Sequence, residues 1–239
     1  MRGNHDESFK TFTGRYTWPL DPKAEDINLV DVAHSLAIIN RYNGHTCAPY
    51  SVADHAVRVS HLVEELATGR MLGDIPHSPG CMIHFEGQAA MCSCGSFGLC
   101  NPGQVPRIAY WGLHHDDSEF LLVDFPRPMK HTEGPLGAEY RAAEERVMRC
   151  VCEFFSMAWP QPFLVDLADV AIRLAEQRDL MNSTGLQRLA DNMDKSSQLL
   201  CRISTQIPTI EPRTWQQSEQ AFYQRHFELE TVLQSQGVN

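Results

Sequence analysis

The chain is built around the stretch Trp111-Gly112-Leu113-His114-His115-Asp116-Asp117-Ser118-Glu119-Phe120. An imidazole and a carboxylate are adjacent at His115 and Asp116, and Glu119 follows the histidine by four residues. On a helix this spacing places Glu119 one turn from His115, on the same face. That face also carries the apolar residues Ile108, Trp111 and Leu122. The sequence therefore predicts one helix that turns polar groups toward the interior or a cleft, where they need hydrogen-bond partners or a metal ion.

Length, charge and hydropathy limit the classes of function. With 239 residues the chain can bury a sizeable core without disulfides, so we expect one domain over 1–239 with a flexible N-terminus over 1–11. The net charge of −10 argues against a nucleic acid polymer as partner, because phosphate binding needs a basic face. No apolar run is long enough to span a membrane, and the N-terminus lacks a signal peptide's apolar core. We expect a cytoplasmic protein without a membrane partner, whose eight cysteines are thiols or metal ligands.

Helical periodicity covers most of the rest of the chain. Helices are expected over about 28–39 with Asn28 as cap, over about 51–66 with Ser51 as cap, and over about 135–154, 163–181 and 214–233. Residues 12–22 suit an ordered irregular arm, and 182–213 a loop or short-helix excursion. No strand pattern and no internal repeat is found. The predicted fold class is all-α.

Three of the predicted helices carry a polar residue on an apolar stripe: His55, the pair His115-Asp116, and Asp169. A histidine in such a place is usually a hydrogen-bonded core residue, whereas a carboxylate there is rarer, because an unpaired buried charge is costly. Together the four would form a mixed nitrogen and oxygen donor set. Such a set suits Zn, Mn, Co, Fe or Mg and does not choose among these divalent metals.

The order His…His-Asp…Asp resembles that of the HD-domain metal-dependent phosphohydrolase superfamily. The resemblance is carried by Tyr50-Ser51-Val52-Ala53-Asp54-His55, by residues 113–119 and 124–130, and by Ala168-Asp169 with residues 176–181. These segments, with the arm over 14–22, are most similar to the branch of bacterial and phage 5′-deoxynucleotidases and deoxynucleoside triphosphohydrolases. The resemblance extends from about 12 to 235, and it implies an HD-type helical bundle in a bacterial cell or a phage-infected host.

The resemblance also implies roles for particular residues. The metal ligands would be His55, His115, Asp116 and Asp169. Glu119 would orient or deprotonate the attacking water, Asp124 would contact the sugar, and Arg41, with His45 as a helper, would bind the substrate phosphate. The implied reaction is attack of metal-activated water on the α-phosphorus of a deoxynucleotide. Whether the substrate is a monophosphate or a triphosphate stays open, as does the oligomeric state, and a homo-oligomer is compatible with the sequence.

Residues 69–106 interrupt the helical pattern as an irregular insertion rich in Cys, Gly and Pro. Cys81 and His84 have the spacing of a metal-binding pair, and Cys92, Cys94 and Cys100 supply further thiols. Four such ligands would hold a structural zinc and order a long loop. The alternative is a mobile loop with free thiols, since Cys-x-Cys is a weaker signal than two Cys-x-x-Cys pairs.

Two further classes of function remain beside the phosphohydrolase. One is a non-catalytic HD fold that binds a nucleotide as a regulator, which loss of a metal ligand would indicate, and all four candidates are present. The other is a zinc-binding interaction module centred on the insertion, with the helical bundle as scaffold. Metal content of an insertion-deleted protein would separate this module from the enzyme.

Overall fold

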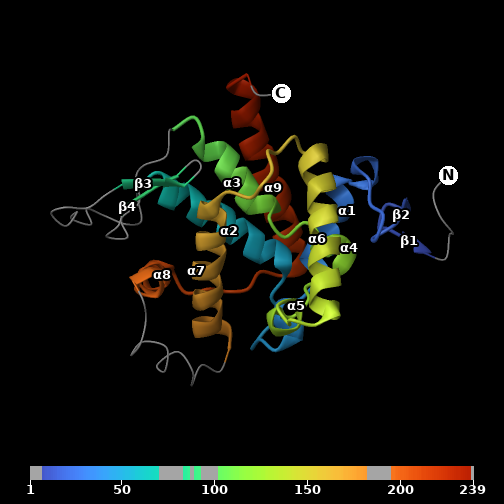
Figure 1. Cartoon of the computed structure of the whole chain (residues 1–239), viewed down its shortest axis with the longest axis horizontal. Coiled ribbons are helices and arrows are strands. Elements are labelled where there is room, and N and C mark those ends of the chain that lie inside the picture. The colour runs from blue at the N-terminus through green and yellow to red at the C-terminus, as the bar shows by residue number, and fades with distance from the viewer. Residues whose placement is uncertain (1–6, 70–82, 87–88, 93–101, 182–194, 238–239) are drawn as a thin grey trace.

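A computed structural model of the chain describes residues 7–69, 83–86, 89–92, 102–181 and 195–237 (Figure 1). The described part is mostly helical, and its helices pack together into a bundle, which confirms the expected all-α class. At the centre lies α2 (Val52–Ala67), which packs against α1 (Leu29–Ile38), α3 (Val105–His114), α7 (Phe163–Leu180) and α9 (Trp215–Ser235). The apolar faces of these helices bury one continuous hydrophobic cluster.

Other helices surround this centre. The long α6 (Pro135–Phe154) contacts the short α4 (Glu119–Leu122) and α5 (Arg127–Lys130), and α8 (Lys195–Gln206) packs on α7 (Figure 1). Single turns of 3-10 helix lie at Ala24–Asp26 and Arg41–Gly44. None of the helices in the described ranges is both long and apolar enough to cross a membrane.

The expected helix starts are confirmed at the capping residues. The side chain of Asn28 accepts a hydrogen bond from the N–H of Val30 at 2.8 Å, and the Ser51 hydroxyl accepts one from Asp54 at 3.2 Å. Each bond satisfies a backbone donor that the first turn of a helix leaves without an intrahelical partner. Ser51 thereby fixes where α2 begins, and so which face of α2 His55 occupies.

Small residues allow α2 and α3 to approach closely. A methyl group at Gly112 would lie 3.1 Å from both the Cα of Ser60 and a methyl carbon of Val63, tighter than most such contacts. The Ser60 hydroxyl donates to the carbonyl of Ala109 at 2.7 Å, which ties the two helices together. This crossing is what brings the ends of α2 and α3, with His55 and His115, to one place.

The expectation of a single helix through Glu119 is wrong. Helix α3 ends at His114, and Glu119 begins the separate α4. Between them the chain tightens into hydrogen bonds three residues apart, from the N–H of Asp117 to the carbonyl of His114 and from Glu119 to Asp116. The buried imidazole of His114 bonds the Asp117 carboxylate at 2.6 Å, which favours this tighter turn. His115 and Glu119 therefore do not share one helical face.

The N-terminal region is more regular than its sequence predicts. Strand β1 (Phe9–Lys10) pairs with β2 (Tyr16–Thr17), so the expected flexible end over 1–11 is wrong for its last residues, and so is the absence of strands. The Asp31 carboxylate on α1 holds the turn, since it accepts from the N–H and hydroxyl of Thr13 and from the hydroxyl of Thr11. Because these bonds join the arm to α1, local periodicity could not predict them.

The insertion contains a second hairpin, between β3 (Ile83–Glu86) and β4 (Ala89–Cys92), where an irregular segment was expected. His84 and Cys92 belong to these strands, while Cys81, Cys94 and Cys100 lie outside the described residues. The structural zinc therefore stays a prediction. Four cysteines outside the insertion form no disulfide among the described residues, as expected: Cys47, Cys150, Cys152 and Cys201.

Candidate functional site

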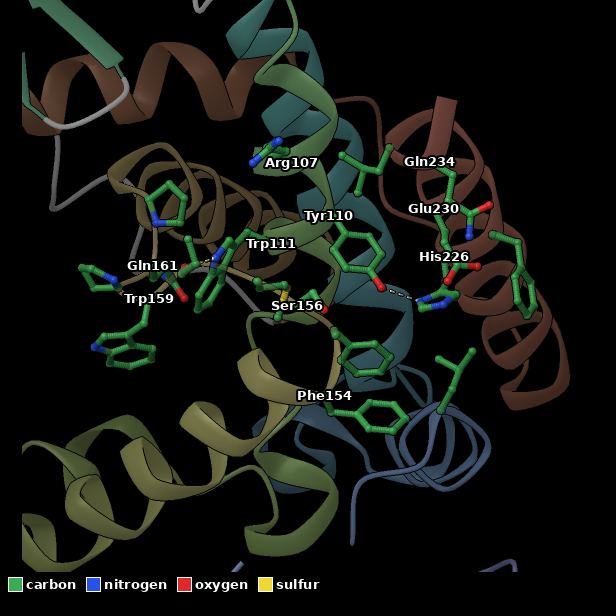
Figure 2. Close-up of a pocket in the computed structure, with 18 of the residues that line it drawn as sticks. Arg107, Tyr110, Trp111, Phe154, Ser156, Trp159, Gln161, His226, Glu230 and Gln234 are labelled. Atoms are coloured by element: carbon green, nitrogen blue, oxygen red, sulfur yellow. Dashed lines mark hydrogen bonds between the residues drawn. The ribbon is translucent and has the colours of Figure 1, made fainter. Parts of the chain in front are cut away.

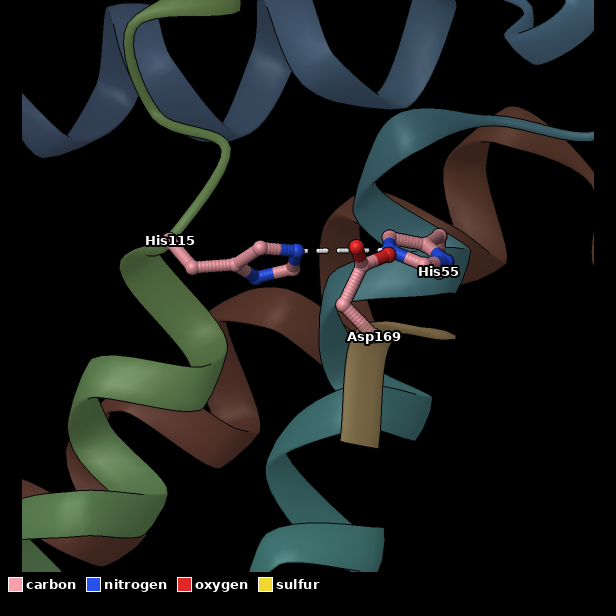
Figure 3. A group of neighbouring side chains, drawn as sticks. All are labelled: His55, His115 and Asp169. Carbon is pink, nitrogen blue, oxygen red and sulfur yellow. Dashed lines mark hydrogen bonds and ion pairs between the residues drawn. The ribbon is translucent and has the colours of Figure 1, made fainter. Parts of the chain in front are cut away.

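Four of the predicted ligands converge from three parts of the bundle. His55 comes from α2, His115 and Asp116 from the turn that follows α3, and Asp169 from α7 (Figure 3 shows His55, His115 and Asp169). The Nε2 atoms of the two histidines are 3.3 Å apart, and an Asp169 oxygen lies 3.2 Å from Nε2 of His55. Ligand atoms from His55, His115 and Asp169 all lie within 4.8 Å of one another, as in a group able to hold a metal ion.

Asp116 adds a fourth donor to this group. Its Oδ2 atom lies 3.3 Å from Nε2 of His115 and 3.6 Å from Nε2 of His55. The two histidines are buried, whereas the side chains of Asp116 and Asp169 keep 19% and 24% of their surface exposed. The histidine nitrogens of the group are therefore buried in the core, and its carboxylates are partly exposed to solvent.

Hydrogen bonds behind the histidines set which nitrogen faces the group. Nδ1 of His55 lies 2.6 Å from Oε1 of Glu176, and Nδ1 of His115 lies 2.9 Å from the carbonyl of Gly112. Carbonyl and ionised carboxylate oxygens only accept, so each Nδ1 carries the proton and donates it. In the neutral imidazoles both Nε2 atoms then present lone pairs to each other. A positive charge between the two Nε2 atoms would stabilise these lone pairs. Two imidazole nitrogens and two carboxylates are a donor set that suits a divalent cation.

The charges around the group raise the pKa of His55 and lower the pKa of Asp169. Burial and Arg41 lower the pKa of His55, but Glu176 and Asp169 outweigh them and raise it to about 9. Burial acts to raise the pKa of Asp169, but its hydrogen bond with His55 and the histidine charges lower it to about 2. The carboxylates therefore stay ionised at neutral pH and favour positive charge at the imidazoles, which a proton or a metal ion can supply.

A loop before α2 places Arg41 beside this group. The loop is closed by hydrogen bonds between the N–H of Arg41 and the carbonyl of Tyr50, and between Val52 and Ile39. Arg41 is buried, and its NH1 donates to Oδ2 of Asp116 at 3.2 Å, while its Nε lies 3.4 Å from Oε2 of Glu176. Arg41, the predicted phosphate-binding residue, thus lies beside the predicted ligands. These four residues are called the metal group below: His55, His115, Asp116 and Asp169.

The two residues after Arg41 adopt an unusual backbone. Tyr42 and Asn43 have φ angles of 55° and 50°, in the left-handed region that non-glycine residues rarely occupy. The Tyr42 hydroxyl donates to Oε2 of Glu176 at 2.7 Å, and its N–H donates to Asp124 at 3.3 Å. These bonds hold the strained turn across the site, and strain of this kind gathers at functional sites.

The other predicted residues are placed as follows. Glu119 is buried at the start of α4, and its Oε2 has no hydrogen-bond partner within the described residues. Burial, Asp116 and Asp124 raise its pKa well above that of an exposed glutamate. Asp124 is half-buried and accepts from Tyr42, and burial likewise raises its pKa. His45 is exposed on the loop.

A cavity of about 290 Å³ opens beside the carboxylates. Its walls include His115, Asp116 and Asp169, together with two cationic residues, Lys130 and Arg141. Lys130 forms an ion pair with Glu144, and Arg141 donates to the backbone carbonyl of Lys130. The metal group therefore lies at the edge of a cavity whose lining combines these two cations with five carboxylates, those of Asp116, Glu144, Glu145, Asp166 and Asp169.

Sequence reasoning assigned no role to Glu176 or Tyr42. Glu176 lies seven residues after Asp169, on the same face of α7, so a second carboxylate on the apolar stripe was the available signal. It is completely buried, and it contacts His55, Tyr42 and Arg41. No sequence pattern indicated Tyr42, because its contacts depend on a left-handed backbone conformation that the sequence does not predict.

Comparison with known proteins adds relatives but no activity. No family model matches the chain. The chain is 26% identical over 171 residues to the uncharacterized protein YfdR of Escherichia coli (strain K12), which covers 72% of this chain and 71% of that protein. It is 30% identical over 144 residues to an uncharacterized protein of Rhodobacter capsulatus, which covers 59% of this chain and 55% of that protein. The chain thus spans about half the length of the second relative.

Proposed function

We propose that this protein is a metal-dependent phosphohydrolase of the HD type that acts on deoxynucleotides. The observation that carries the proposal is the convergence of two Nε2 atoms and two carboxylates at distances of 3.2–3.6 Å, with both Nδ1 atoms already bonded. The order of these residues in the chain resembles that superfamily. His55, His115, Asp116 and Asp169 would hold the cation.

A divalent cation in such a site lowers the pKa of a water molecule and polarises a phosphoryl oxygen. The residues around the cation would bind the substrate phosphate and transfer the proton. Arg41 would neutralise charge on the substrate phosphate, and Lys130 and Arg141, the cationic residues that line the cavity, would contact that phosphate. Burial of Arg41 strengthens its effect, because charges interact more strongly away from water.

Glu119 handles the proton. Water attacks the α-phosphorus, the bond from phosphorus to the 5′ oxygen breaks, and Glu119 takes the proton of the water and delivers it to the leaving oxygen. A raised pKa suits this exchange, since a carboxyl group then gains and loses a proton nearer to neutral pH. The products are a nucleoside and phosphate from a monophosphate, or a nucleoside and triphosphate from a triphosphate.

The test is a panel of deoxynucleotides and ribonucleotides, each as mono-, di- and triphosphate, incubated with the protein and Mn²⁺ or Co²⁺. We expect release of phosphate or triphosphate from deoxynucleotides, with a lower kcat/KM for the ribonucleotides if Asp124 meets the sugar edge. Glu119→Gln should keep the metal and lose turnover by about 10² to 10⁴. Glu139→Gln, at an exposed glutamate of α6 outside the cavity, is the matched control. Nucleotide binding without hydrolysis would favour the regulator instead.

A further inference from the structure

A second and larger cleft, of about 810 Å³, lies between α3, α9 and the segment that joins α6 to α7 (Figure 2). It shares Trp111, Trp159 and Gln161 with the cavity of the metal group, but none of the four predicted ligands lines it. Its volume is within the range of small-molecule sites. The proposed phosphohydrolase reaction makes no use of this cleft.

The walls of the cleft are aromatic. Tyr110 and Trp111 from α3, Phe154 and Phe155 from α6, Trp159 from the connecting segment and Phe227 from α9 all line it (Figure 2). Three of these rings are partly in solvent, with 43% of Phe154, 39% of Trp159 and 52% of Phe227 exposed. Aromatic faces gain most from another flat ring, in stacked or edge-to-face contact. The walls therefore select a planar aromatic ligand.

The cleft also contains a polar group, the Tyr110 hydroxyl, which favours a ligand with a hydrogen-bond acceptor. The Tyr110 side chain is 5% exposed, and its hydroxyl lies 3.5 Å from Nδ1 of His226, longer than a normal hydrogen bond (Figure 2). That same Nδ1 lies only 3.0 Å from Nε2 of His114. One ring nitrogen makes one good in-plane hydrogen bond, and the shorter contact takes it. The hydroxyl of Tyr110 therefore keeps a proton to donate to an acceptor on a ligand.

The charge of this region favours a neutral ligand. Burial and His114 lower the pKa of His226 to about 3, so its imidazole is uncharged at neutral pH. The acidic and basic residues that line the cleft, Glu230 and Arg107, have opposite signs; Arg107 is exposed and Glu230 is half-buried. Among the described residues that line the cleft, no charged side chain is fully buried to pair with an ionised ligand, and burying such a ligand unpaired would be costly.

We propose that this cleft binds an uncharged, planar heteroaromatic molecule whose hydrogen-bond acceptor receives the proton of the Tyr110 hydroxyl. The aromatic walls supply affinity, and Tyr110 supplies the preference for a ring that contains an acceptor. None of the four predicted ligands lines this site, so its occupation can be measured apart from the proposed hydrolysis.

Two bicyclic probes of nearly equal shape test the proposal. Quinoline carries a ring nitrogen that accepts a hydrogen bond, whereas naphthalene carries none. Saturation-transfer NMR titrations of the whole protein should give quinoline a dissociation constant about threefold to tenfold below that of naphthalene. Tyr110→Phe should remove this difference by weakening quinoline binding alone. Tyr223→Phe, at a tyrosine of α9 outside the cleft, should leave the difference intact.

A second substitution tests the contribution of the aromatic wall. Phe227→Ala removes an exposed ring without disturbing the core, and it should weaken both probes equally. Equal affinities of the two probes in the unaltered protein would overturn the proposal, as would no binding of either. A concentration-dependent dimer that Phe227→Ala dissociates, with neither probe bound, would also overturn it and make the cleft a contact between two copies of the chain.

Discussion

Glu176 shows how one buried side chain can organise the candidate site. One of its oxygens accepts from Nδ1 of His55, and the other accepts from the Tyr42 hydroxyl and lies beside Arg41. The positive charges of Arg41 and His55 overcome the effect of burial and lower the pKa of Glu176. An ionised Glu176 fixes the His55 tautomer that turns Nε2 toward the group, and it raises the basicity of that nitrogen.

We expect Glu176→Gln to weaken metal binding by about tenfold to a hundredfold, because the amide oxygen still accepts from His55 but carries no charge. Isothermal titration with Mn²⁺ measures the dissociation constant. Tyr42→Phe serves as a graded control, since it removes one hydrogen bond of Glu176 and keeps the bond to His55. An unchanged dissociation constant in Glu176→Gln would remove Glu176 from the support of the metal group.

The sequence contained the group itself but not its supporting contacts. His55 and Asp169 were visible because they stand on apolar stripes, where a polar side chain needs an explanation. The bond from Glu176 to His55 joins residues 121 positions apart, and the bond from Asp124 to Tyr42 depends on a left-handed turn. Such contacts follow from packing, so periodicity along the chain cannot reveal them.

At the scale of elements, the crossing of α2 and α3 controls the distance between the two histidines. Gly112→Ala should force the helices apart by a few tenths of an ångström, because the added methyl group would meet backbone at Ser60. We expect a loss of about 1–3 kcal/mol of stability, and weaker metal binding, from this overpacking. Thermal unfolding with and without Mn²⁺ measures both effects. Gly134→Ala, where the nearest atom is 3.8 Å away, is the matched control and should change neither by a comparable amount.

The elements also show where sequence patterns succeed and fail. Helices α1 and α2 begin at the expected caps Asn28 and Ser51, because capping is a local interaction, and α9 begins next to Thr214, close to its expected start. The end of α3 at His114 was missed, because apolar residues continue beyond it and conceal the tight turn. The β1–β2 hairpin was missed because α1, through Asp31, stabilises it.

At the scale of the whole molecule, a buried neutral histidine predicts how stability depends on pH. The pKa of His226 is about 3 in the folded protein, below the ordinary value of about 6.5 in the unfolded chain. Between these values the unfolded chain binds the extra proton, so stability falls as the pH drops below about 6.5. This one residue should cost about 2 kcal/mol between pH 7 and pH 5.

Urea unfolding of His226→Gln at both pH values isolates this effect. The variant should be less stable than the unaltered protein at pH 7, and the difference should shrink by about 2 kcal/mol at pH 5. His45→Gln, at an exposed histidine, is the control. A difference for His226→Gln that does not change with pH would contradict the buried neutral state.

The central claim concerns the molecule as a whole, because the four predicted metal ligands come from segments far apart in the sequence. Titration of the protein with Co²⁺, followed by visible absorption, tests it most directly. We predict one Co²⁺ per chain with a spectrum of mixed nitrogen and oxygen ligation, lost in Asp169→Ala and kept in Asp166→Ala. Asp166 lies one turn earlier on α7, lines the same cavity and bonds Gln161 instead. Equal Co²⁺ binding by both variants, or no binding by the unaltered protein, would contradict the account.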